Sequence, residues 1–74
     1  MAMSAWNDLT STQYTVASLV VAGYVDREIG AHLGLPGFAV NAHVCEVYRK
    51  LGVQSRAELT TAWAVELDRS VGAL

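Results

Sequence analysis

The fold is decided by residues 26–51, which read DREIGAHLGLPGFAVNAHVCEVYRKL. A short helix is expected over about 26–33, because its apolar residues fall four apart and face one side. Pro36 marks a tight turn, since proline cannot extend the preceding helix but suits the first turn of the next one. A longer helix is expected over about 38–51, with apolar residues at helical spacing: Val40, Val44, Val47 and Leu51. A short helix, a turn and a longer helix form a helix-turn-helix, a pair that also occurs in many helical bundles.

Capping signals on either side of this stretch predict two further helices. Thr10 and Gln13 have the spacing of a capping box, which opens a helix over about 11–22. Residues 55–58, Ser-Arg-Ala-Glu, repeat that spacing and open a helix over about 56–68. No strand pattern competes with these signals. The sequence therefore predicts an all-α fold, a four-helix bundle that contains the helix-turn-helix.

The length of the chain bounds its organisation. With 74 residues the chain is expected to form one domain over 9–69. Residues 1–8 are expected to be an N-terminal extension or linker, and residues 70–74 a C-terminal tail. We find neither a long apolar run nor a secretory signal, so a cytoplasmic protein with no membrane contact is expected. The lone Cys45 cannot form a disulfide within the chain.

The charge distribution bears on the partner. A net charge of −2 is unusual for a nucleic-acid-binding domain, which is normally basic. Most of the basic residues nevertheless gather in and beside the helix-turn-helix, at Arg27, Arg49, Lys50 and Arg56. The hydrophobic fraction of 53% is high for so short a chain, so some apolar surface is expected to remain for a partner.

The order of residues across 9–67 resembles that of bacterial LuxR-type transcription regulators. The most specific part of the resemblance is 49–59, RKLGVQSRAEL. The other positions in register are Leu9, Thr10, Gly23, Arg27 to Ile29, Leu33 to Leu35, Val40 and His43. The resemblance implies a domain that binds double-stranded DNA in transcription regulation. It implies no cofactor and no metal ion.

The resemblance also implies which residues touch DNA. In such regulators the helix that here spans Phe38 to Leu51 lies in the major groove, and the outward face near its start reads base edges. That face carries Asn41, Ala42 and Cys45. An asparagine is suited to the N6 and N7 atoms of adenine, and an alanine to the methyl group of thymine. The residues in positions that hold phosphates are Arg27, Lys50, Arg49 and Arg56.

The fourth helix provides the dimer face in this family. The resemblance therefore implies a homodimer, with Trp63 and Leu67 as the candidate interface residues. Trp63 also suits the core of a single domain, and that alternative stays open. A sensor or receiver domain upstream of the chain is a further partner that the resemblance leaves open.

Several DNA-facing positions depart from the family pattern. Asn41 stands where lysine is frequent, and Pro36 stands where a serine or threonine usually caps the helix. Glu46 would repel phosphates, and we expect it to pair with Arg49 or Lys50. An alternative function is therefore a protein-interaction module that keeps the helix-turn-helix fold but has lost DNA binding. An enzyme is not expected, because no catalytic grouping of side chains is evident.

Overall fold

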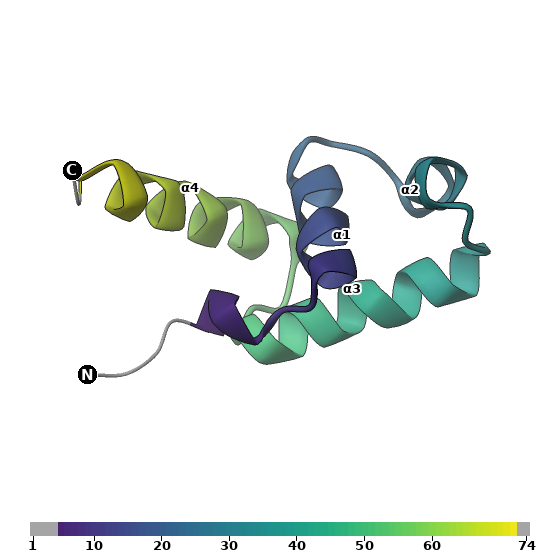
Figure 1. Ribbon diagram of the computed structural model, residues 1–74, viewed down its shortest axis with the longest axis horizontal. Helices are drawn as coiled ribbons and strands as arrows, with labels where there is room; N and C mark the ends of the chain where they lie inside the picture. Colours follow the sequence, from purple (N-terminus) through teal and green to yellow (C-terminus); the bar gives the residue numbers. More distant parts are fainter. Residues whose placement is uncertain (1–4, 73–74) are drawn as a thin grey trace.

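The computed structural model describes the backbone of residues 5–72 and the side chains of residues 5–68. Its elements, in chain order, are a 3-10 helix η1 (Ala5–Asp8) and the α-helices α1 (Ser11–Val21), α2 (Asp26–Leu33), α3 (Gly37–Leu51) and α4 (Arg56–Gly72). The described part of the chain contains no strand. The predicted all-α bundle with a helix-turn-helix is confirmed, and α2 and α4 lie on opposite sides of α1 (Figure 1).

Side-chain caps fix where two of the helices begin. Before α1, the Thr10 hydroxyl accepts from the Gln13 N–H at 3.1 Å, and the Gln13 side-chain oxygen accepts from the Thr10 N–H at 3.1 Å. This confirms the first capping box. Before α4, the Ser55 hydroxyl accepts from the Glu58 N–H, but the Glu58 carboxylate accepts from the N–H of Gln54 instead of Ser55. The second box is therefore only half formed.

The turn between α2 and α3 folds back against α2. The Leu35 N–H donates to the Gly30 carbonyl at 3.0 Å, and Gly34 has a φ of +69°, a conformation that glycine adopts without strain. A Cβ atom at Gly30 would lie 2.5 Å from the Leu35 carbonyl oxygen. Gly30 thus lets the turn fold back onto α2, and this sets the direction in which α3 leaves it.

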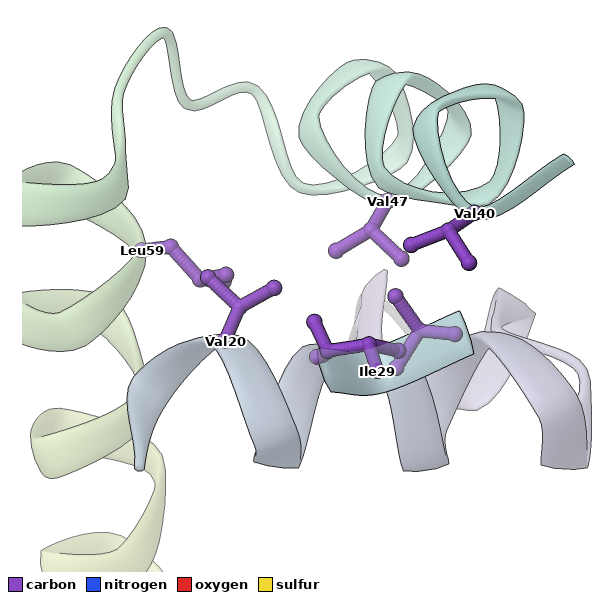
Figure 2. Close-up of a cluster of buried hydrophobic side chains, with 7 residues drawn as sticks. Val20, Ile29, Val40, Val47 and Leu59 are labelled. Atoms are coloured by element: carbon purple, nitrogen blue, oxygen red, sulfur yellow. The ribbon is translucent and has the colours of Figure 1, made fainter. Parts of the chain in front are cut away.

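A small core joins the four helices. Its fully buried side chains come from each of the four α-helices and are Val16, Ala17, Val20, Ile29, Val40, Val47 and Leu59. Figure 2 shows Leu59 of α4 pointing toward Val20 of α1, while Val40 and Val47 point from α3 toward the side of Ile29. The core therefore fixes the inward face of α3 and leaves its opposite face outside.

The last helix extends past this core. Leu59, near the start of α4, is buried, whereas Val65 and Leu67 are 55% and 50% exposed. The final turns of α4 project beyond the other helices (Figure 1). The predicted end near residue 68 was too early, because no glycine or proline interrupts the chain before Gly72. Within residues 5–72, no helix is both long and apolar enough to cross a membrane.

Candidate nucleic-acid interface

The outward face of α3 carries the three residues expected to touch bases. Asn41, Ala42 and Cys45 are all exposed, and their spacing of one and four residues places them on one side of the helix. Val40 and Val47, on the other side, are buried. The helix is therefore anchored by its apolar stripe and presents a small polar and apolar surface to solvent.

Phe38 belongs to the same face and was not predicted as a site residue. It lies three residues before Asn41 and four before Ala42, and 80% of it is exposed. The helical spacing between Phe38 and Asn41 is visible in the sequence, but Phe38 was predicted only as the first residue of the helix. We define the reading face as Phe38, Asn41, Ala42 and Cys45.

One turn further along α3, an ion pair neutralises the basic charge. The Arg49 guanidinium donates to the Glu46 carboxylate at 2.7 and 3.2 Å. This hydrogen bond holds the pKa of Glu46 below its ordinary value and raises that of Arg49. The expected pairing of Glu46 is confirmed, with Arg49 as the partner. Arg49 is exposed on the same side of α3 as Cys45, but it shares its charge with a neighbour.

Lys50 is half-buried and forms hydrogen bonds within the domain. Its ammonium donates to the Asp8 carbonyl at 2.9 Å and to the Gln13 side-chain oxygen at 2.8 Å. These bonds tie the end of α3 to η1 and to the capping box of α1. An ammonium has three N–H donors, so one remains for another acceptor. The sequence did not reveal this role, because the partners lie 37 and 42 residues away along the chain.

Arg56 is held in a similar way at the start of α4. Its guanidinium donates to the Val20 carbonyl at 2.7 Å and to the Tyr24 carbonyl at 3.1 Å. Carbonyls at the end of a helix lack partners within it and carry partial negative charge, which a cation stabilises. Arg56 therefore joins α4 to the end of α1 and to the loop that leads into α2.

Arg27 differs from these three cations. It is exposed in the first turn of α2. Among the basic residues whose side chains the structure describes, it is the one with no ion pair or hydrogen bond through its side chain. Its guanidinium can therefore bind an external anion without giving up a bond to a described side chain.

The candidate dimer residues lie on one stripe of α4 but in different surroundings. Trp63 packs in an aromatic cluster with Trp6 and Tyr14, at ring-centre distances of 5.3 and 5.1 Å. Leu67, one turn later, is half exposed. The structure thus places Trp63 largely within the domain and leaves Leu67 accessible.

Comparison with known proteins supports the family resemblance. The sequence profile of the bacterial regulatory proteins of the luxR family matches residues 7–63. The chain is 37% identical over 54 residues to provisionally named HTH-type transcriptional regulators of Mycobacterium bovis and of two strains of Mycobacterium tuberculosis. The match covers 73% of this chain and 6% of each relative, so the chain spans a small part of their length. No solved structure matches the chain significantly.

Proposed function

Because the chain belongs to the luxR family of bacterial regulatory proteins, we propose that it binds double-stranded DNA through α3 in the major groove. The observation that carries the proposal is the uncovered reading face of α3, held outward by the buried stripe on the other side of the helix. An α-helix fits the major groove, where each base pair presents a distinct pattern of groups. Asn41, Ala42 and Cys45 are the proposed base contacts. We place the action of the domain in the cytoplasm.

Phosphate contacts would position the domain on DNA. Arg27 is the principal candidate because its charge is free, and Lys50 can add its remaining donor. Arg49 and Arg56 would contribute only by sharing or exchanging their present partners. With about two effective phosphate contacts per monomer, the logarithm of the binding constant should fall with that of the salt concentration at a slope of about −2. Binding by one domain is therefore expected to be weak.

A homodimer would double these contacts. Leu59, Trp63 and Leu67 form one stripe of α4, and the stripe loses its cover only where the helix leaves the core. A second copy packed against Leu67 and the edge of Trp63 would extend that cover. In a longer protein, an upstream sensor or receiver domain would control the approach of the two copies.

A second candidate function rests on a specific observation. Three of the four basic residues in and beside the motif already have partners inside the domain. A helix-turn-helix with so little free positive charge also suits a protein-interaction module that no longer binds DNA.

An NMR titration of the labelled 74-residue chain with a mixed-sequence duplex at low salt separates the two functions. Under the DNA proposal, shifts concentrate at Arg27 and on the reading face. Arg27→Ala should weaken binding to every duplex to a similar extent, and Asn41→Ala should change sequence preference. Arg27→Lys keeps the charge and serves as the matched control.

Two results would contradict the DNA proposal. One is a well-dispersed spectrum that no duplex perturbs, which favours the interaction module. The other is a set of shifts on α4 alone. A salt slope that requires six or more phosphate contacts per monomer would instead contradict the assignment of Arg27 as the main free cation.

A further inference from the structure

The reading half of α3 has no charge with which to recognise bases. From Gly34 to Cys45 the chain contains no lysine, arginine, aspartate or glutamate. Guanine is usually bound by the paired donors of arginine or lysine, and the amino group of cytosine by a carboxylate. The nearest charged groups on α3, Glu46 and Arg49, are bonded to each other. The groups left on the reading face are one amide, one thiol and two apolar side chains.

Phe38 is the largest of these groups, and 80% of it is exposed. Single exposed apolar residues are common on proteins, so exposure alone carries no meaning. The position of Phe38 is what matters, because it stands one turn before Ala42 and Asn41 on the same side of α3. A helix that places Asn41 against a base edge therefore brings Phe38 to the neighbouring base steps. The C5-methyl group of thymine is the apolar feature that the major groove offers there.

We propose that Phe38 is a specificity-determining residue that, with Ala42, recognises the C5-methyl groups of thymines beside the adenine read by Asn41. The inference rests on the proposed DNA binding and deepens it, since it names the chemical class of the target as A·T-rich sequence marked by pyrimidine methyl groups. The affinity gained from this contact comes from the burial of apolar surface, so it does not depend on the salt concentration. A domain with few free cations gains affinity in this way without further positive charge.

Deoxyuridine tests the proposal, because it lacks only the methyl group of thymine. We would compare two mixed-sequence A·T duplexes, one with thymine and one with deoxyuridine throughout, by fluorescence anisotropy at low salt. The wild-type chain should bind the thymine duplex more tightly, by about fourfold for each methyl group contacted. Phe38→Ala should remove most of that difference. Because 80% of Phe38 is exposed, the substitution should leave the circular dichroism spectrum unchanged.

Further controls distinguish methyl recognition by Phe38 from DNA binding as such. Val65→Ala removes a comparable exposed apolar group from α4 and should keep the preference for thymine. In a G·C duplex, replacing cytosine by 5-methylcytosine should strengthen wild-type binding and should strengthen binding by the Phe38→Ala variant much less, because Ala42 remains. Equal binding of the thymine and deoxyuridine duplexes by the wild type would overturn the inference and leave DNA binding intact. Failure to bind any duplex would overturn both.

Discussion

A basic side chain strengthens DNA binding only to the extent that its charge is free of partners within the protein. Lys50 and Arg56 donate to carbonyl oxygens of other elements, and Arg49 is paired with Glu46 on its own helix. The exposed Arg49–Glu46 pair contributes little to stability, whereas the bonds of Lys50 and Arg56 join separate elements of the fold. In each case the present partner must be released or shared before a phosphate can take its place. At the scale of residues, this domain uses its cations mainly to hold itself together.

Glu46→Gln should therefore increase DNA affinity, by about two- to fivefold, because it frees Arg49 for a phosphate. Fluorescence anisotropy with one duplex at several salt concentrations measures the affinity and the salt slope, which should become steeper. Asp68→Asn makes the same change in net charge on an exposed residue of α4 and is the control. An equal gain from both substitutions would show that net charge, and not the release of Arg49, is responsible.

The pair is not itself sensitive to pH near neutrality. The hydrogen bond from Arg49 lowers the pKa of Glu46 below its ordinary value. The contribution of the Arg49–Glu46 pair to stability is therefore fully present above the pKa of about 4.3 that a glutamate has in an unfolded chain. It is lost only as the pH falls through the lower value of the folded state. Between pH 5 and 8 the carboxylate remains a competitor for Arg49.

At the scale of elements, the helix-turn-helix depends on one glycine in the middle of a helix. Glycine is unfavourable at such a position by about 1 kcal/mol relative to alanine. Gly30 is nevertheless required because the carbonyl of Leu35 lies where its side chain would begin. The turn and α3 are thus placed against α2 by a backbone contact that no larger residue allows.

Gly30→Ala should destabilise the fold by about 1–3 kcal/mol, because the α2–α3 turn must move away from the added methyl group. Urea unfolding followed by circular dichroism measures this loss. Gly37→Ala is the matched control, since nothing lies within 4 Å of its Cβ position and its φ is not positive. That substitution should be neutral or stabilising by up to about 1 kcal/mol. Equal effects at both positions would contradict the role assigned to Gly30.

The features of the fold that depend on local spacing could be predicted from the sequence. The apolar periodicity of α3, the cap at Thr10 and the turn at Pro36 act over a few residues, and they predicted the helices closely. The internal partners of Lys50 and Arg56 come from tertiary packing, to which no local pattern points. The face of α3 was predicted except for Phe38, although its helical spacing was visible. The contacts of this face with DNA remain predictions.

At the scale of the whole molecule, the later turns of α4 carry apolar side chains that the core leaves exposed, Val65 at 55% and Leu67 at 50%. The apolar stripe of α4 begins in the core at Leu59, continues through the aromatic cluster at Trp63 and emerges at Leu67. An apolar stripe that continues along the helix beyond the core is suited to packing against a second copy of the chain. The buried part of the stripe would then fix the position of the exposed part in both copies.

Leu67→Glu should reduce self-association by about tenfold or more, because it places a charge in the proposed dimer contact. Sedimentation equilibrium at several concentrations measures the dissociation constant. Val65→Glu makes the same change on another side of α4 and should leave it unaltered. A wild-type chain that stays monomeric at the highest concentration would overturn the dimer proposal. Equal effects of the two substitutions would show that the dimer interface is not confined to the side of α4 that carries Leu67.

The aromatic cluster gives this molecule an optical signature of its own. The two tryptophans of the chain, Trp6 and Trp63, have their ring centres 5.3 Å apart at an interplanar angle of 76°. At that separation and angle, the electronic transitions of the two indoles couple and contribute to the near-ultraviolet circular dichroism. One indole belongs to η1 and the other to α4, so the band records whether the segment before α1 is seated on the last helix. An unlabelled sample therefore reports the docking of η1 on α4.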